Sequence, residues 1–389
     1  MMPRKRYDAL IVGARCAGAA TAMLMARRGL TVLAIDRGGY GTDTLSTHAL
    51  MRGAVLQLHR WDVLPRIVEM GTPAVRSTTF HYGEETIALP IKPVHGVDAL
   101  YAPRRTVLDS VLVDAAQEAG AEVRHGCALT GLIRRSDGRV AGAVVRDGEG
   151  RSLEIAADLV VGADGVGSAV ARLAGAPVQH AARHATATLY GYWSGIDADG
   201  FRWHYREGAG TGLIPTNAGQ ACVFAAIPPD RFRREARHDL RALHRRIIAE
   251  STPDLMSALN SARPEGRMWA FAGRRGFLRQ ACGPGWALVG DAGYFKDPLT
   301  AHGITDALRD AELLATAAAH ATPAAFDDYA EARDALSLPL FHATDAIASF
   351  AWDLDRLKDL HQALNKAMKR EVDWIAERAA MANACAPAF

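Results

Sequence analysis

The sequence predicts an α/β fold with three parts: a Rossmann-like domain with a β-meander, an inserted and mostly antiparallel sheet, and C-terminal helices. A strand pattern over residues 7–12, a glycine turn, a helical pattern over 17–28 and a strand pattern over 31–35 form a βαβ opening. Three short β runs between 131 and 158 are separated by Asp-Gly pairs, which favour hairpin turns and predict the meander. Aromatic-rich strands between 186 and 272 predict the inserted sheet.

The remaining segments extend the first domain. We expect a helix over 108–119, which Gly120 ends, and then a strand over 122–124. The apolar runs 158–162 and 286–290 have the length and composition of buried strands. A further helix is expected from about 304 to 319.

Other segments belong to the inserted sheet and to the C-terminal end. Residues 77–89 predict a hairpin that turns at Gly83, and one helix is expected over about 232–250. The pattern from 324 to 380 is mainly helical. We therefore expect a discontinuous nucleotide-binding domain, a substrate domain and a C-terminal helical segment. The nucleotide-binding domain comprises residues 1–75, 101–178 and 283–335. The substrate domain comprises 76–100 and 179–282, and the C-terminal helical segment comprises 336–389.

Composition excludes several classes of protein. The 389 residues carry 45 basic and 43 acidic side chains, a balance that excludes a strongly basic nucleic-acid binder. No apolar run reaches the roughly 18 residues that a membrane span needs, and no signal-peptide cleavage region follows the N-terminus, so we expect a cytoplasmic protein. The cysteines form no CxxC pair, which argues against a disulfide framework or a zinc site, and we expect no metal.

The strongest local motif lies between the first strand and the first helix, over residues 11–18. Gly13 permits the tight turn, and Gly18 lets the helix pack close to the strand. The free N–H groups at the helix start then face a phosphate, and the carboxylate of Asp36 can accept both hydrogens of a ribose diol. The alternative is a plain βαβ packing turn with no ligand.

One position departs from the dinucleotide pattern, because Arg15 replaces the middle glycine of GxGxxG. Either the loop is displaced from the pyrophosphate, or the guanidinium contacts the cofactor or the substrate side. Cys16 lies in the same loop, where a small buried residue is the alternative to a redox or covalent role.

Two further motifs each follow a buried strand far downstream. The first is Val-Gly-Ala-Asp-Gly over 161–165; the second is Leu-Val-Gly-Asp-Ala-Gly over 288–293, followed by Asp-Pro at 297–298 and His-Gly-Ile at 302–304. Asp291 lies where open α/β sheets bind ligands, with a helix N-cap as the alternative. For Asp164 the alternative is a plain turn. The N-terminus of the helix that Gly303 opens can stabilise negative charge on a ligand.

With these motifs in this order, the first 335 residues or so resemble the flavoprotein monooxygenases of the p-hydroxybenzoate hydroxylase type, with the related flavin halogenases and geranylgeranyl reductases. The resemblance implies a Rossmann-like FAD-binding domain and adds Arg105, which opens a helix beside the cofactor. The run Asp-Thr-Leu-Ser-Thr-His over 43–48 resembles an actinobacterial oxidoreductase branch with diverse substrates. The cofactor-binding candidates are Gly13, Arg15, Cys16, Ala17, Gly18, Asp36, Arg37, Ser46, Thr47, Arg105, Asp164, Gly290, Asp291, Pro298, His302, Gly303 and Ile304.

The resemblance implies an FAD-dependent monooxygenase that hydroxylates or epoxidises an apolar or aromatic small molecule with molecular oxygen, through a flavin C4a-hydroperoxide. Only one dinucleotide loop is present, so NADPH or NADH docks transiently or a partner flavin reductase supplies electrons. An ene-reductase, dehydrogenase or halogenase of the same superfamily and a non-catalytic flavin-binding protein are the alternatives. The halogenase Trp-x-Trp-x-Ile-Pro segment is incomplete, since Ile214 and Pro215 lack the paired tryptophans. We expect a monomer or homodimer with no nucleic-acid or membrane partner.

Aromatic residues alternate along the inserted sheet, and they either fill the core between sheet and domain or contact substrate. The candidates for the substrate pocket are Tyr190, Phe201, Trp203 and Tyr205. The candidates for proton transfer are His302, Lys296, Tyr192, His48 and His204, each with a structural or solvated side chain as the alternative. Arginines at helical spacing between 231 and 246 indicate a solvated basic face, with a docking site for a polyanion or reductase as the alternative.

Overall fold

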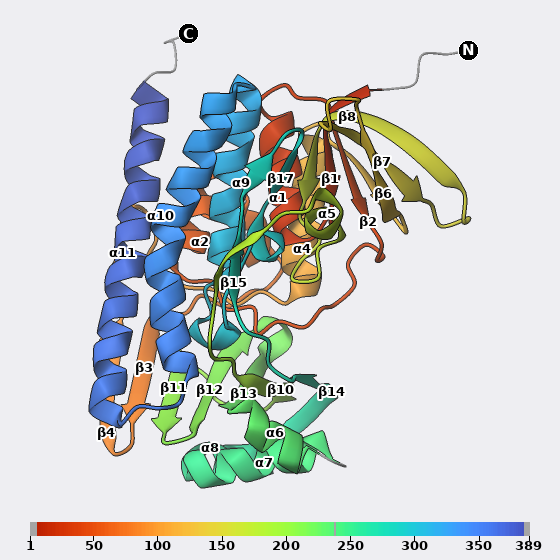
Figure 1. The fold of residues 1–389 in the computed structure, drawn as a ribbon. Helices are drawn as coiled ribbons and strands as arrows, with labels where there is room; N and C mark the ends of the chain where they lie inside the picture. The colour runs from red at the N-terminus through yellow and green to blue at the C-terminus, as the bar shows by residue number, and fades with distance from the viewer. Residues whose placement is uncertain (1–5, 237–238, 385–389) are drawn as a thin grey trace.

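The computed structural model describes residues 6–236 and 239–384. Figure 1 shows a first half around β1, β8 and α1, a second half around β10–β13, and two long C-terminal helices that run beside both. The α/β fold class with an inserted, mostly antiparallel sheet is confirmed. No helix in the described part of the chain is both long and apolar enough to span a bilayer.

The first sheet has the order β16-β17-β8-β1-β2-β5, with the meander strands β6 and β7 attached to β8. β1 pairs in parallel with both β2 and β8, and β17 pairs in parallel with the other edge of β8. The carboxyl ends of these strands therefore share one edge, where open α/β sheets bind ligands. The strands are β1 (Arg6–Val12), β2 (Val32–Asp36), β5 (Glu122–His125), β6 (Ala128–Arg134), β7 (Val140–Arg146), β8 (Ser152–Gly162), β16 (Cys282–Gly283) and β17 (Trp286–Leu288).

Helices pack against the first sheet, and their apolar side chains form a buried core with it. α1 packs against both α4 and α9, and apolar residues of all three belong to one buried cluster. The predicted helices over 17–28, 108–119 and 304–319 are confirmed with small shifts of their ends. The helices of this half are α1 (Cys16–Ala26), α2 (Arg52–Arg60), α3 (Leu64–Glu69), α4 (Arg105–Glu118), α5 (Ala169–Ala174) and α9 (Gly303–His320).

The second sheet has the order β14-β10-β13-β12-β11-β3-β4, and all its pairs are antiparallel except β3 with β11. The predicted hairpin over 77–89 is confirmed as β3 and β4, with Gly83 in the turn. The strands are β3 (Ser77–Tyr82), β4 (Glu85–Pro90), β10 (Ala187–Ser194), β11 (Phe201–Arg206), β12 (Ala209–Thr216), β13 (Gln220–Ile227) and β14 (Arg263–Phe271).

The single helix predicted over 232–250 is wrong. The segment forms α6 (Pro229–Glu235) and α7 (Leu240–Ser251), and α8 (Pro253–Ser261) follows. The break has a local cause, since Asp239 accepts hydrogen bonds from the backbone N–H groups of Arg241 and Ala242 and so begins a new helix. The basic face is largely paired: Arg231 contacts Glu235 and Glu250.

The two faces of the second sheet pack against different partners. Leu189, Val223 and their neighbours on one face pack against α7 and α8. The opposite face, which carries Tyr192, Trp203 and Tyr205, joins the apolar cluster of the first half. A third sheet has the order β18 (Tyr294–Phe295), β15 (Phe277–Arg279) and β9 (Val178–Ala181); β9 and β15 lie in the two chain segments that connect the halves.

The C-terminal helices α10 (Pro323–Ala348) and α11 (Leu354–Ala384) confirm the mainly helical pattern predicted after residue 324. α10 packs against α9, and α11 packs against α10 and α2. At its beginning α11 reaches the second sheet, where the His361 ring lies 4.7 Å from that of Tyr205. α11 therefore contacts both halves of the molecule (Figure 1).

Candidate functional site

The glycine loop after β1 is fixed by backbone packing. Gly13 has a φ of +102°, and a Cβ there would lie 2.3 Å from the carbonyl oxygen of Ala163 at the end of β8. A Cβ on Gly18 would lie 1.7 Å from the carbonyl oxygen of Gly13. The loop thus lets α1 start directly above the strand ends, as a phosphate-binding turn requires.

Arg15 occupies its position without strain, since its φ of −86° and ψ of −169° are ordinary extended values. The guanidinium donates to the carbonyl oxygen of Thr42 at 3.0 Å and to Asp109 Oδ2 at 3.0 Å. The arginine in the glycine pattern therefore links the loop to the 37–47 segment and to α4.

A carboxylate that sequence reasoning left without a role lies at the start of α1. Asp109 Oδ1 accepts hydrogen bonds from the backbone N–H of Cys16 at 3.1 Å and from Nη2 of the Arg105 guanidinium at 2.9 Å. Both side chains are buried on α4, four residues apart, so the helical spacing in the sequence was the available signal. Burial raises the pKa of the Cys16 thiol to about 11, so the thiol stays protonated at neutral pH.

The two other acidic candidates near this edge already accept backbone hydrogen bonds. Asp36 accepts the N–H groups of Ala14 at 2.8 Å and Gly38 at 2.7 Å. Each carboxylate oxygen retains a second lone pair for a ribose hydroxyl. Asp164 accepts the N–H of Ala169 at the start of α5, whereas Arg37 is exposed to solvent.

The segment after β17 approaches the glycine loop. Gly290 has a φ of +56°, and a Cβ there would lie 3.2 Å from the Cβ of Ala17 and 3.1 Å from that of Ala307. The first and last motifs of the sequence, with the beginning of α9, therefore converge on one place. Asp291 is partly buried there, and burial raises its pKa to about 6. Among the described residues, none donates a hydrogen bond to this carboxylate.

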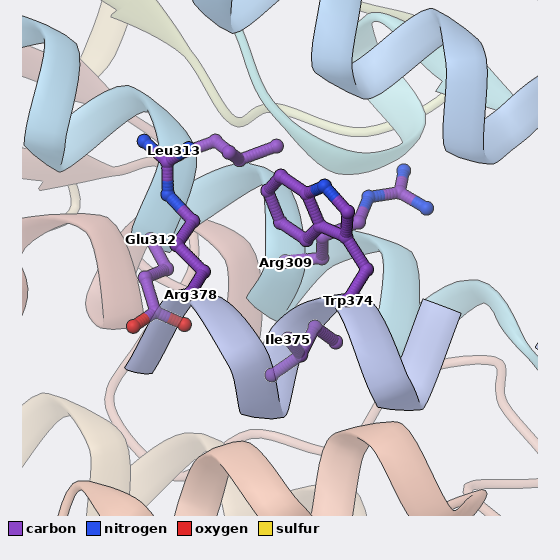
Figure 2. A pocket seen from close by; sticks show the side chains of 6 residues that line it. All are labelled: Arg309, Glu312, Leu313, Trp374, Ile375 and Arg378. Carbon is purple, nitrogen blue, oxygen red and sulfur yellow. The ribbon is translucent and has the colours of Figure 1, made fainter. Parts of the chain in front are cut away.

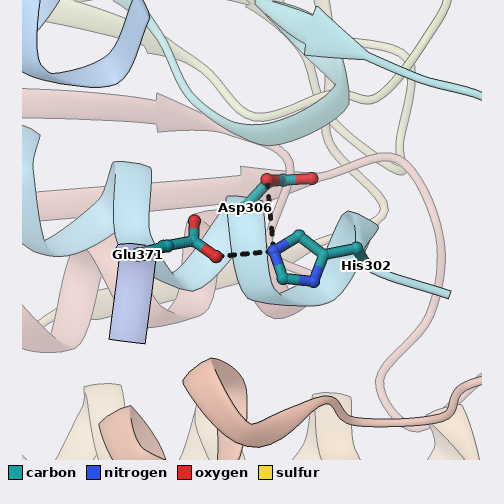
Figure 3. A group of neighbouring side chains, drawn as sticks. All are labelled: His302, Asp306 and Glu371. Carbon is teal, nitrogen blue, oxygen red and sulfur yellow. Dashed lines mark hydrogen bonds and ion pairs between the residues drawn. The ribbon is translucent and has the colours of Figure 1, made fainter. Parts of the chain in front are cut away.

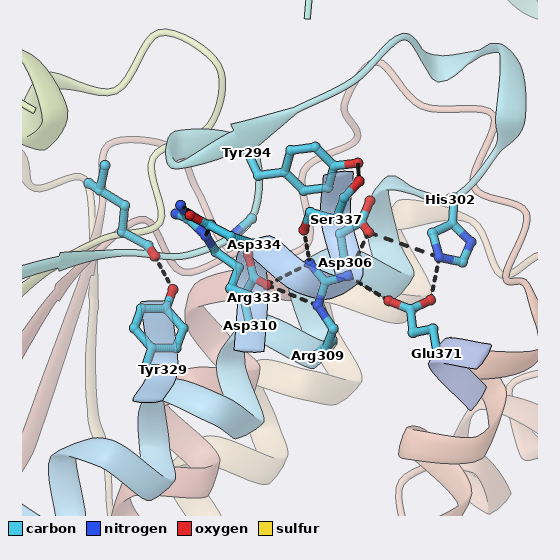
Figure 4. Close-up of polar contacts among 12 residues, drawn as sticks. Tyr294, His302, Asp306, Arg309, Asp310, Tyr329, Arg333, Asp334, Ser337 and Glu371 are labelled. Atoms are coloured by element: carbon cyan, nitrogen blue, oxygen red, sulfur yellow. Dashed lines mark hydrogen bonds and ion pairs between the residues drawn. The ribbon is translucent and has the colours of Figure 1, made fainter. Parts of the chain in front are cut away.

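A buried network of charged side chains lies at the start of α9 (Figure 4). Lys296 pairs directly with Asp306, and Arg309 Nη1 contacts Asp306 Oδ1 at 3.2 Å. Arg309 Nη2 contacts Asp310 Oδ1 at 2.9 Å, and the other oxygen of Asp310 accepts the N–H of Gly290 at 3.1 Å. The network therefore connects α9 to the motif that contains Asp291.

His302, the proton-transfer candidate beside this motif, belongs to the same network. Its Nε2 lies 2.6 Å from Oε2 of Glu371 on α11, and the imidazole is 1% exposed. Burial lowers the pKa of His302, and the Glu371 carboxylate offsets only part of that effect. Glu371 is 69 residues away in the sequence, and no pattern near it predicted this contact.

His302, Asp306 and Glu371 place three potential metal-ligating atoms within 4.8 Å of one another (Figure 3). The carboxylates already have cationic partners, however. Lys296 neutralises Asp306, and Arg309 contacts both Asp306 and Glu371. A divalent cation would have to displace these buried pairs, so the arrangement fits an ion-pair network rather than a metal centre.

A small cavity lies between the aromatic face of the second sheet and the turn after Asp297. Asp297 holds this turn by accepting the backbone N–H and the hydroxyl of Thr186, both at 2.6 Å. The cavity is lined by Thr47, Thr188, Trp203, Phe224, Ala226, Pro298, Leu299 and Ala301. Trp203 thus lines a cavity, whereas Phe201 and Tyr205 are packed in the core.

His48 and Tyr192 form a buried pair behind Thr47. His48 Nδ1 lies 3.1 Å from the carbonyl oxygen of Ala102, which can only accept, so Nδ1 carries the proton. Burial lowers the pKa of His48 to about 3, so its Nε2 accepts from the Tyr192 hydroxyl at 3.0 Å. The Arg104 guanidinium lies 3.6 Å from the Tyr192 ring centre and pairs with Asp43 at 2.6 Å.

Two more candidates lie apart from the cavity lining. The hydroxyl of Tyr190 accepts the backbone N–H of Ser46 at 2.8 Å, and its ring stacks on Trp269. His204 stacks on His81 at 4.1 Å, on the sheet face opposite Trp203. The structure therefore places Lys296 and His302 in one network and His48 and Tyr192 in one pair. His204 lies apart from both.

A second small cavity lies between α9 and α11 (Figure 2). Its lining consists of Arg309, Glu312, Leu313, Trp374, Ile375 and Arg378. The Arg378 guanidinium lies 5.2 Å from the Trp374 ring centre. The side chains of α9 and α11 therefore leave a gap within two helical turns of Glu371.

Comparisons with known proteins agree with the geometry. A family model described as FAD binding domain matches residues 6–338. Protein FixC of Salmonella typhi is 30% identical over 236 residues, which are 58% of this chain and 50% of FixC, so the chain spans about half the length of that relative. A digeranylgeranylglycerophospholipid reductase of Methanosarcina mazei is 28% identical over 338 residues, 83% of this chain and 77% of the reductase. The structure of the flavin-dependent brominase Bmp2 has a TM-score of 0.82 at 18% identity, covering 95% of this chain and 93% of Bmp2, and shows the same fold.

The residues at this edge fit FAD. Buried His302 Nδ1 and Thr305 Oγ1 have no partner among the described residues, and both lie at the start of α9. Asp291 receives no hydrogen bond from the described residues, and its Oδ1 would lie 3.9 Å from a Cβ added to Gly303, which is an ordinary contact distance. These unsatisfied groups and the close approaches at Gly13, Gly18 and Gly290 are what an extended, polar dinucleotide needs.

Proposed function

The chain belongs to the FAD binding domain family and is an FAD-dependent oxidoreductase, and from that premise we propose that it is a monooxygenase. Its proposed substrate is a small apolar or aromatic molecule, which it hydroxylates or epoxidises with molecular oxygen. NADPH or NADH, docking transiently, or a partner flavin reductase supplies the electrons. We propose the division into FAD-binding and substrate domains given above, with the cavity beside Trp203 as the substrate pocket.

The proposed cofactor contacts follow the two convergent motifs. The N–H groups at the start of α1 bind the pyrophosphate, and Asp36 accepts from the ribose of the adenosine half. Asp291 accepts from a ribityl hydroxyl, and the beginning of α9 faces the flavin ring. Bound FAD supplies two-electron redox chemistry and the reaction with oxygen.

The lining of the cavity is the observation that carries the proposal. Its side chains are apolar except for two threonine hydroxyls and the tryptophan N–H. Such a lining binds an uncharged, apolar molecule and keeps water from the reacting atoms. Among the described residues that line it, none is a carboxyl, thiol, imidazole or ammonium group that could protonate a carbon atom. Transfer of an oxygen atom requires no such acid, whereas reduction of an isolated double bond does.

The residues around the cavity have distinct proposed tasks. The His48–Tyr192 pair lies beside Thr47 and orients the cavity wall, with both nitrogens of His48 already engaged. Lys296 is paired with Asp306, and so contributes charge to the site rather than a free amine. His302 is the remaining candidate for proton transfer, since its Nδ1 has no partner among the described residues.

Isotope labelling tests the proposal. The balanced reaction is substrate, O2, NAD(P)H and a proton giving oxygenated product, water and NAD(P)+. The FAD-loaded protein is incubated with NADPH or NADH, or with a general flavin reductase, under 18O2 and with a panel of small aromatic and isoprenoid compounds. We expect a product that carries one 18O atom. Product in which the oxygen comes from water, or NAD(P)H consumption that produces only hydrogen peroxide with every compound, would contradict the proposal.

A second candidate is the reduction of carbon–carbon double bonds in an apolar chain. It is favoured by the reductase of Methanosarcina mazei, which aligns with 83% of this chain. The same compounds are incubated without oxygen with dithionite or NAD(P)H. A product heavier by two hydrogen atoms, formed under anaerobic conditions, would support this function and displace oxygenation.

A further inference from the structure

Helix α11 places one carboxylate inside the buried network at the beginning of α9. The family match ends at residue 338, whereas α11 starts at Leu354, so this carboxylate comes from outside the matched domain. Glu371 is 0% exposed, although neighbouring positions of α11 such as Asp373 are exposed. A fully buried carboxylate is costly unless each oxygen has a donor.

Both oxygens of Glu371 have such a donor. Oε2 lies 2.6 Å from His302 Nε2, and Oε1 lies 2.6 Å from Arg309 Nη1. His302 and Arg309 outweigh the opposing effect of burial and lower the pKa of Glu371, so the carboxylate is ionised. An ionised carboxylate only accepts hydrogen bonds, so Nε2 of His302 carries a proton.

The protonation of the other ring nitrogen, Nδ1, follows from the proton on Nε2. Figure 3 shows Glu371 and Asp306 on the Nε2 side of the ring, with the second nitrogen on the opposite edge. This Nδ1 is buried and has no partner among the described residues. In a neutral imidazole with its proton on Nε2, Nδ1 has a free lone pair and can accept a hydrogen bond or a proton.

The charges around the ring determine how readily it takes a second proton. The cations Lys296 and Arg309 face the carboxylates of Asp306, Asp310 and Glu371. Burial, which has the largest effect, and these two cations lower the pKa of His302, and the Glu371 carboxylate opposes them only in part, so the ring is neutral at pH 7. Glu371 is the carboxylate in direct contact with the ring, since Asp306 Oδ1 is 3.9 Å from Nε2.

We propose that Glu371 is a positioning residue for His302: it fixes the tautomer with the proton on Nε2 and so presents Nδ1 as the acceptor for an N–H or O–H group of cofactor or substrate. The inference rests on the proposed placement of His302 at the FAD site. It makes the C-terminal helix a functional part of the site, and not only a cover for the second sheet.

Histidine NMR on the native FAD-loaded protein tests the tautomer directly. Two-bond 15N–1H spectra of the 15N-histidine-labelled protein at pH 7 distinguish the two neutral tautomers, and His302→Asn assigns the signal. We expect a protonated Nε2 and an unprotonated Nδ1. A proton on Nδ1 with Nε2 unprotonated would overturn the inference.

Three variants separate positioning from structural support. Glu371→Gln keeps the size but removes the charge, Glu371→Asp restores the charge, and Glu377→Gln removes an exposed charge from the same helix. In Glu371→Gln we expect mixed tautomers and at least tenfold weaker proton binding by His302, with the limb of the kcat/KM profile that reports His302 about one pH unit lower. Glu371→Asp should recover the native tautomer at least in part, and Glu377→Gln should behave as wild type.

The outcomes are distinguishable. An unchanged His302 signal in Glu371→Gln would overturn the inference, because a merely structural carboxylate has no effect on the tautomer. If Glu371→Gln does not fold, Glu371→Asp and the wild-type spectrum decide. Failure to incorporate 18O, with the expected histidine spectra, would refute the monooxygenase proposal and leave the role of Glu371 intact.

Discussion

Replacing Asp291 should weaken FAD binding and abolish its pH dependence. Burial raises the pKa of this carboxyl from 3.8 to about 6 in the structure, and no described residue donates a hydrogen bond to it. One pKa unit corresponds to about 1.4 kcal/mol, so burial costs the ionised form about 3 kcal/mol. A hydroxyl of FAD that donates to the carboxylate offsets this cost, and a hydrogen bond to a charged group contributes about 1.5–3 kcal/mol.

The sign of the pH effect follows from these values. Without FAD the raised pKa favours the protonated carboxyl, so the stability from this group is present below about pH 4 and lost as the pH rises through 6. FAD favours the ionised form, so its affinity should rise with pH and fall about tenfold for each pH unit below 6. Asp291→Ala should raise the Kd about 10- to 150-fold at pH 7.5, and Asp291→Asn should remove the slope between pH 5 and 7.

Fluorescence titration of FAD into the apo-protein measures both effects. Asp328→Asn changes an exposed aspartate on α10 and serves as the matched control, with wild-type affinity expected at every pH. Equal Kd values for wild type and Asp291→Ala, or the same slope between pH 5 and 7 in Asp291→Asn, would refute the assignment of Asp291 to a hydroxyl of FAD.

Four further predictions follow from the packing. Glu371→Ala leaves His302 and Arg309 without their buried partner and should cost about 3–5 kcal/mol of stability, visible as a lower Tm; a Tm within a degree of wild type would contradict the buried network. Gly18→Ala puts a Cβ 1.7 Å from a backbone oxygen, so the purified protein should lose most of its FAD absorbance at 450 nm, whereas exposed Gly148→Ala, whose Cβ makes only an ordinary contact, should keep it. Trp203→Leu enlarges the proposed pocket and should raise KM severalfold with FAD content unchanged; an unchanged KM would remove Trp203 from the pocket. Asp239→Ala removes the cap of α7 and should cost about 1 kcal/mol in urea unfolding, with no effect on FAD content.

Local sequence patterns predicted the parts of the site that local chemistry determines. The positions of Gly13 and Gly18 between a strand and a helix are dictated by close backbone approach, which only glycine permits. The end of β17 is marked by an apolar run followed by Gly290 and Asp291. The family match over residues 6–338 confirms the resemblance that these separated motifs predicted.

The rest of the site depends on contacts between distant segments. The residues that flank Glu371 in the sequence are largely polar and do not indicate a buried position. The burial of Glu371 follows only from how α11 packs on α10 and α2. Arg104 stacks on Tyr192 because the second sheet folds back onto the first domain. The prediction of one continuous helix in place of α6 and α7 was an error of local interpretation. The Asp239 cap is visible in the sequence, but the helical spacing of the arginines on both sides of it favoured a single helix.

The most direct test of the site is a crystal structure of the FAD-loaded protein. We expect density for the pyrophosphate at the start of α1, a ribityl hydroxyl on Asp291, and the flavin ring between the beginning of α9 and the cavity beside Trp203. Flavin density on the other side of the sheet, or a flavin ring that contacts neither the Gly290–Gly303 segment nor this cavity, would contradict the account.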